Sequence, residues 1–199
     1  MLAEASLTST DETERKVEAM SPQEEDDRRA GPHSGVKTAF TAMLKVKPGH
    51  EQVLRELIEH DHEHSAPTHG ALKQIGTLHE FRWVLFDNDR RLLFTSAFDG
   101  DWEKYVQDFA STDVGIMIDR NLAHVEDWVG INDPGASEQL LRYGVPASQY
   151  ATAYSEATVK QVWKALDVQK AFEQVLNDPD AAEALQHPAL KPLLEQAAD

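Results

Sequence analysis

Hydrophobic and polar residues alternate in four short stretches of the chain, and this alternation predicts four β-strands. In the first stretch, Phe40 and Leu44 are apolar whereas Thr41 and Lys45 are polar. A period of two residues is typical of a strand that buries one face. The predicted strands cover residues 36–47, 77–87, 91–98 and 123–129.

Between these strands, apolar residues recur every three or four positions, which is the pattern of a helix with one buried stripe. Leu54 and Ile58 belong to such a stripe, and Asp101 stands where it would cap a later helix. Pro67 and Gly76 predict a loop between the first helix and the second strand. The helices predicted in this part of the chain cover residues 49–64, 102–109 and 112–121.

The order of these elements is β-α-β-β-α-β, the split βαβ arrangement of ferredoxin-like folds. We therefore expect an α+β protein whose antiparallel sheet, over residues 35–130, carries both helices on one face. The other face would be covered by a ligand, a second subunit or an added segment. Residues 131–199 are predicted to be a C-terminal extension packed on this core. It would contain an extended strand over residues 149–158 and helices over residues 137–143, 158–177 and 180–197.

Residues 1–34 are polar, acidic and without a periodic pattern. The run from Glu24 to Arg29 contains no aromatic or β-branched residue. Such a segment buries too little apolar area to offset the entropy lost on ordering. We therefore expect a disordered acidic tail in front of the folded core.

Composition and charge narrow the classes of function. The 199 residues include no cysteine, which excludes disulfides, thiolate metal sites and cysteine nucleophiles. The sequence shows neither a membrane-spanning run nor a signal-peptide pattern, so we expect a cytoplasmic protein. A formal net charge of −16 disfavours nucleic acid and anionic membrane surfaces as partners, because both attract basic faces.

Two stretches resemble a known superfamily: HEFRWV at residues 79–84 and RLLFTSAFDGDW at residues 91–102. With weaker similarity at residues 124–128 and 150–154, they resemble the dimeric α+β barrel superfamily. That superfamily includes antibiotic-biosynthesis-type monooxygenases, dye-decolorising-peroxidase-like proteins and proteins of unassigned role. The resemblance implies a homodimer paired sheet to sheet and a pocket that holds a substrate or, in some branches, haem. Peroxidases of this superfamily normally need two such units, whereas this chain has one.

His79, Arg82 and Trp83 are candidate site residues on the second strand, with Arg82 on the face opposite to the other two. His79 is a candidate general base or axial metal ligand, since a neutral imidazole is available near pH 7. The alternative is a strand-end histidine satisfied by water or backbone. Arg82 is suited to binding a carboxylate, or alternatively to a structural ion pair with Asp99.

Further substrate-binding candidates lie near the end of the third strand. Phe98, Asp99 and Trp102 surround a strand-to-helix turn whose free N–H groups are able to hold an anion. The alternative is a helix cap followed by a core tryptophan. Tyr154 is expected to line the mouth of a pocket, or simply to pack.

Histidines offer two metal-capable patterns. His124, with Glu126 on the same face, is a weak metal candidate, and the case for a haem or metal site improves if His124 and His79 face one cavity. His60 and His64 are four residues apart on a helix, but their surroundings favour a solvated helix end.

Two functions follow from these observations. The first is a small-molecule-binding α+β barrel protein, an oxidoreductase that acts with haem or without a cofactor on an apolar or aromatic substrate. The alternative is a non-catalytic module whose sheet face and C-terminal helices dock a protein partner.

Overall fold

The computed structural model describes residues 21–64 and 66–197. In chain order its elements are α1 Pro22–Ala30, β1 His33–Ser34, β2 Lys37–Lys45, α2 Glu51–Glu63, α3 Ala66–Ile75, β3 Leu78–Phe86, β4 Arg91–Asp99, α4 Trp102–Ala110, α5 Asp113–Leu122, α6 Ala136–Tyr143, α7 Val159–Leu176, the 3₁₀ turns η1 Pro179–Ala181 and η2 Pro188–Leu190, and α8 Ala182–Leu185 and α9 Lys191–Ala197. No helix in these residues is both long and apolar enough to cross a membrane.

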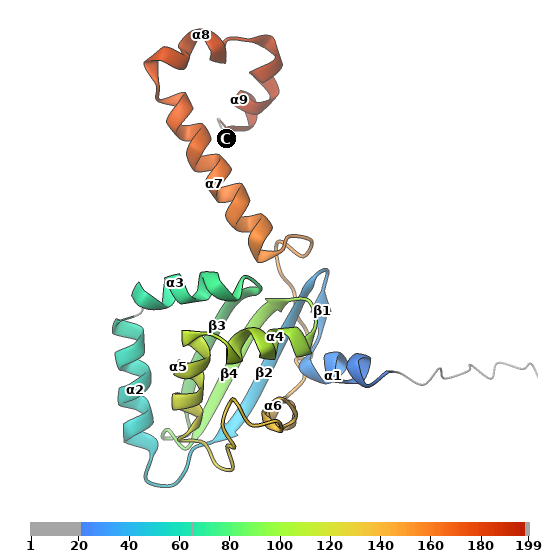
Figure 1. Cartoon of the computed structure of the whole chain (residues 1–199), viewed down its shortest axis with the longest axis vertical. Helices are drawn as coiled ribbons and strands as arrows, with labels where there is room; N and C mark the ends of the chain where they lie inside the picture. Colours follow the sequence, from blue (N-terminus) through green and yellow to red (C-terminus); the bar gives the residue numbers. More distant parts are fainter. Residues whose placement is uncertain (1–20, 65, 198–199) are drawn as a thin grey trace, which may run out of the picture.

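The strands form one four-stranded antiparallel sheet in the order β1-β2-β4-β3. Helices α4 and α5 lie in front of the sheet in Figure 1, and α2 stands beside α5. The chain is therefore a small α+β protein, as the alternating and helical patterns predict. The three long strands begin and end within one or two residues of their predicted limits.

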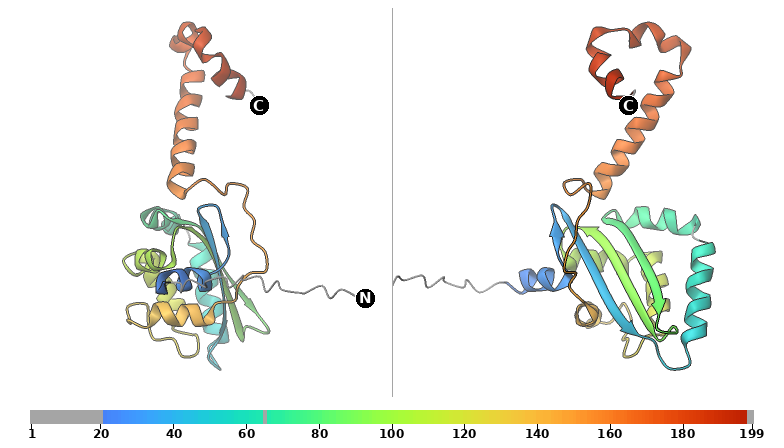
Figure 2. Two further views of the ribbon diagram at one scale, coloured as in Figure 1. Left: turned by 90° about the vertical axis from the view of Figure 1, so that its right-hand side faces the viewer. Right: turned by 180° about the vertical axis from the view of Figure 1, so that it is seen from behind.

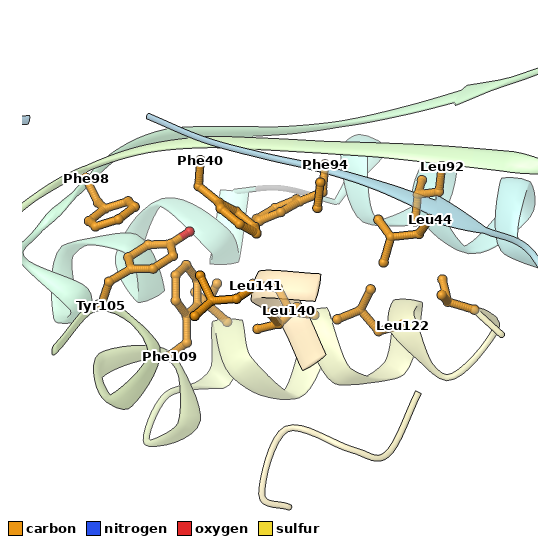
Figure 3. Close-up of a cluster of buried hydrophobic side chains, with 14 of the residues drawn as sticks. Phe40, Leu44, Leu92, Phe94, Phe98, Tyr105, Phe109, Leu122, Leu140 and Leu141 are labelled. Atoms are coloured by element: carbon orange, nitrogen blue, oxygen red, sulfur yellow. The ribbon is translucent and has the colours of Figure 1, made fainter. Parts of the chain in front are cut away.

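The core lies between the sheet and these helices (Figure 3). Alternate residues of each long strand point into it, so that Phe40 and Phe94 pack edge to face at 6.3 Å between ring centroids. Tyr105 stacks on Phe98 at 3.8 Å and donates its hydroxyl to Ser96. The buried aliphatic side chains labelled with them are Leu44, Leu92, Leu122, Leu140 and Leu141.

Residues 123–129 do not form the predicted fourth strand, so the sheet does not have a clean ferredoxin-like strand order. The segment pairs with the sheet through one isolated bridge, between Val46 and Val125. The chain leaves α5 in tight turns, in which the N–H of His124 donates to the carbonyl of Asn121, and Asp127 adopts a φ of 61°. This curled backbone cannot extend along β2, and β1 supplies the fourth strand instead.

The outer edge of β2 is covered by three separate pieces of chain. At one end β1 pairs with Lys37 and Thr38, and the N–H of Ala39 donates to Pro32. Farther along, Ala42 bridges to Gly144. At the other end lies the bridge to residue 125. Together they satisfy backbone groups that one long strand would otherwise pair.

Within the predicted tail, residues 22–30 form α1 and residues 33–34 form β1. Ser21 and Glu24 form a capping box at the start of α1. Arg29 makes two 3.0 Å hydrogen bonds to Glu138 on α6, and Asp27 accepts the backbone N–H of Trp102. Charged contacts therefore order this stretch with little apolar burial, which the reasoning from hydrophobicity does not detect. Residues 1–20 lie outside the described residues.

The C-terminal extension also differs from the prediction. Residues 149–158 form turns instead of a strand, and the predicted loop after α2 contains α3. Helices α6 and α7 form as predicted, but α7 projects away from the sheet and carries α8 and α9 at its far end (Figures 1 and 2). Val159 is the one buried residue of α7. The extension is therefore packed on the core only up to the first turn of α7.

We predict that Gly31→Ala destabilises the protein more than Gly49→Ala does. Both glycines have positive φ, but a Cβ at Gly31 would lie 2.0 Å from the carbonyl oxygen of Ala39, whereas nothing lies within 4 Å of one at Gly49. Backbone strain of about 1–2 kcal/mol is common to both variants, and the clash with β2 falls on Gly31 alone. Equal urea midpoints for the two variants would show that residues 31–34 do not pack on β2 as described.

Candidate functional site

A pocket of about 470 Å³ opens between α2, α5 and the exposed edge strand β3. Its volume lies within the range of small-molecule sites. Its floor is apolar, and charged side chains of α2 surround it. The lining residues are Ile58, Glu59, Asp61, His62, Glu63, Phe81, Arg82, Trp83 and Met117.

The local sequence places these side chains by simple spacing. Ile58, Asp61 and His62 share one face of α2, because residues three and four apart on a helix are neighbours. Phe81 and Trp83 are alternate residues of β3 and point to the helix-covered side of the sheet, where Trp83 packs on Phe94 at 4.4 Å between centroids. An apolar strand edge and a polar helix face thus meet at the pocket.

Two residues that line this pocket each carry a buried polar atom with no hydrogen-bond partner among the described residues. These atoms are the indole Nε1 of Trp83 and Oδ2 of Asp61. The other oxygen of Asp61 accepts a hydrogen bond from Arg120, which holds the carboxylate in place. Most buried polar groups are paired, so two unpaired groups in residues that line one cavity mark this pocket as the candidate site.

Arg82 lies at the rim of the pocket, on the opposite face of β3 from Trp83 as predicted. Its Nε donates to the hydroxyl of Thr95 at 3.0 Å, and the side chain is exposed. The expected ion pair between Arg82 and Asp99 does not form. Asp99 is bound by His79 instead, at 2.7 Å between Oδ1 and Nε2.

His79 and Asp99 hold the start of the C-terminal arm. The second oxygen of Asp99 accepts the backbone N–H of Val159 at 2.7 Å, so one buried carboxylate joins β3, β4 and α7. His79 lies in a bulge, since Leu78 pairs with Phe98 but Glu80 pairs with Ala97. The bulge breaks the alternation, which is why His79 does not share a face with Trp83 and does not line the pocket.

His124 lies at the other end of the sheet from His79. Its Nδ1 is 2.9 Å from Nδ1 of His50, and burial, followed by the nearby charges of His50 and Lys47, lowers the pKa of His124. The two candidate histidines are separated by most of a nine-residue strand, roughly 25 Å at the usual rise per residue. They do not face one cavity.

The two histidines expected to hold haem are not placed to do so. His79 is engaged by Asp99, His124 is engaged by His50, and neither lines the pocket beside Trp83. Nor do the described residues contain a group of three His, Asp or Glu side chains able to hold a metal ion. His60 and His64 stack on each other, 4.2 Å apart, at an exposed helix end.

The remaining candidates belong to the core or the surface. Phe98 and Trp102 are fully buried in the core. The N-terminus of α4 is already occupied, because Asp27 accepts the N–H of Trp102 and Asp101 accepts that of Lys104. This favours the helix-cap alternative over an anion site. Tyr154 is 68% exposed and lies beside Lys37, away from the pocket.

Reasoning from the sequence identifies Arg82 and Trp83 at the pocket but misses Ile58, Asp61 and Met117. Asp61 stands within the polar run at the end of α2, which has the pattern of a solvated helix end. Its burial depends on Arg120, distant in the chain, so no local signal marks it. No protein-family model, curated protein or solved structure matches the chain.

We predict that Asp99→Asn lowers the free energy of unfolding by about 2 kcal/mol, because an amide cannot accept hydrogen bonds from both His79 and Val159 with two oxygens. Asp101→Asn is the matched control, since asparagine caps helices as well as aspartate does. Urea denaturation measures both, and limited proteolysis of residues 146–158 reports loosening of the arm. Unchanged stability of Asp99→Asn would contradict the described joint.

We also predict that His124 makes the fold weaker in acid. Because its pKa is lowered from the ordinary value of 6.5, the unfolded chain takes up a proton that the folded chain resists. The contribution to stability is present above pH 6.5 and is lost as pH falls through the lower folded pKa. Between pH 7.5 and 5.5, His124→Gln should therefore lose less stability than the unmodified chain, as measured by urea denaturation at the two pH values.

Proposed function

We propose that this protein binds an apolar or aromatic small molecule, carrying a hydrogen-bond donor, in the pocket between α2 and β3. One observation carries the proposal: Asp61, whose Oδ2 has no partner, and Trp83, whose indole N–H has none, line the same cavity. An amine is the ligand donor that a buried carboxylate oxygen favours most, because a charged hydrogen bond is stronger than a neutral one.

The apolar floor of the pocket supports an aromatic or aliphatic ligand body. Ile58, Phe81 and Met117 offer surfaces that release water on contact, and the sulfur of Met117 interacts favourably with aromatic rings. Glu59, Asp61 and Glu63 outnumber Arg82 among the lining residues, and this excess of negative charge disfavours an anionic ligand.

The proposal is limited to binding. The acid–base role expected of His79 would need that side chain beside the ligand, and it is held by Asp99 at a different part of the sheet. The histidines expected to serve a haem-dependent oxidoreductase are His79 and His124, and neither lies at the pocket.

A distant relationship to the dimeric α+β barrel superfamily is part of the proposal. What supports it is the order of the long strands β2-β4-β3 and the helices between them. The expected homodimer also remains a proposal.

The second candidate function is the docking of a protein partner. It is favoured by the exposed apolar side chains of α7, which stands clear of the sheet (Figure 2). The two functions are compatible, because the pocket and α7 are built from different elements.

We predict that 2-phenylethylamine binds this protein and that phenylacetate, with the same ring and the opposite charge, binds at least about tenfold more weakly. Asp61→Asn should weaken binding of the amine about tenfold, since it removes the charge but little volume. Isothermal titration calorimetry measures each affinity.

Arg120→Gln is the matched control, because it breaks the same ion pair but leaves the carboxylate of Asp61 in the pocket. It should retain binding of the amine. Equal losses in the two variants would mean that the ion pair, and not ligand contact, explains the effect. Binding of neither probe would count against the proposed ligand class.

A further inference from the structure

Helix α7 presents apolar side chains to solvent along most of its length. It contains 18 residues, which corresponds to roughly 27 Å, and Val159 is the one that is buried. Leu166 is 57% exposed and Val168 is 59% exposed. Figures 1 and 2 show the helix leaving the sheet from its first turn, so the rest of the protein does not cover these side chains.

The apolar residues of α7 fall on two faces. Val168 follows Val159 by nine residues, about two and a half turns, and so points to the opposite side of the helix. Val168, Phe172 and Val175 are spaced four and three residues apart and form one stripe, in which Val168 and Val175 are exposed and Phe172 is half-buried. Because Val159 fixes the first turn against the core, the stripe around Phe172 cannot turn toward the same core.

The two ends of the arm carry opposite charges. The first two turns of α7 carry Lys160 and Lys164, and residues 167–173 carry charges of both signs. The turn that follows the helix carries Asp178 and Asp180. The two ends of the arm are therefore complementary to each other.

We propose that the partner of α7 is a second copy of this chain, whose α7 packs antiparallel against the first. A two-fold axis near Lys170 would place Val168 of each copy beside Phe172 of the other. It would also bring Lys160 and Lys164 of one copy opposite Asp180 and Asp178 of the second copy. Such an interface uses the same patch on both copies, as closed two-fold symmetry requires.

This inference develops the second candidate function and is independent of ligand binding. An antiparallel arrangement is favoured over a parallel one, which would set lysines against lysines and aspartates against aspartates. Pairing through the open sheet face is less favourable. That face carries the exposed apolar side chains of Met43 and Val84. Its exposed charges are mainly positive, with Lys45, Arg82 and Arg91 against Glu80, so two such faces would bring like charges together.

The first test measures the mass of the full chain by sedimentation velocity over a wide range of concentrations. The unmodified chain should form dimers. The double variant Val168→Glu, Val175→Glu should raise the dimer dissociation constant by about a hundredfold or more, because each dimer would bury four unpaired charges. Val53→Glu, at an apolar side chain of α2 that is 51% exposed, is the matched control and should remain dimeric.

The second test exchanges the charges. Lys160→Glu with Lys164→Glu should weaken the dimer, as should Asp178→Lys with Asp180→Lys, and combining all four changes should restore it. Restoration separates pairing of the arms from a loss of folding, which circular dichroism also checks. Monomeric unmodified chain, or a dimer that Val168→Glu, Val175→Glu leaves intact, would overturn the inference. Binding of 2-phenylethylamine by the monomeric variant would continue to support the proposed ligand site.

Discussion

Strand β2 has backbone groups along both edges, and the need to pair its outer edge organises the rest of the fold. Its inner edge is matched residue for residue by β4. No single strand covers the outer edge, and three segments distant in sequence, around residues 33, 144 and 125, each pair with part of it. Unpaired backbone groups in a sheet are costly when buried and invite association when exposed. The N-terminal segment, the chain after α5 and the chain after α6 therefore all lie along this one edge.

The long strands and most helices of the core are predictable because their apolar periodicity is local. Phe40 and Leu44 indicate the buried face of a strand within a few residues, and Leu54 and Ile58 likewise indicate the buried face of a helix. Residues 123–129 differ. Their alternating pattern predicts a strand, but the structure has turns there, at the end of α5. Helix α1 is invisible to the same reasoning because its contacts, such as Arg29 with Glu138, join residues far apart in sequence.

The residues of the candidate site divide in the same way, into those that the local sequence predicts and those that depend on contacts far apart in the chain. Trp83 is found from strand alternation, whereas Asp61 gains its importance from Arg120 and from the position of β3. His79 shows how a single bulge redirects a predicted residue. One extra residue in the strand turns its side chain away from the face of Trp83 and toward Asp99. Alternation predicts faces only while the ladder stays regular, and bulges are set by pairing with a neighbouring strand.

The buried carboxylate of Asp99 links these observations to the arm. A carboxylate removed from water must find donors, and here one is the ring of His79 and the other is the first N–H of α7. The carboxylate thereby fixes where α7 begins and, through the capping box at Thr158, the direction in which it leaves. A helix held at its first turn and pointed away from its own core has to leave its later apolar residues uncovered. The hydrogen bonds of Asp99, at the end of β4, thus leave uncovered the surface of α7 on which we propose that a second copy packs.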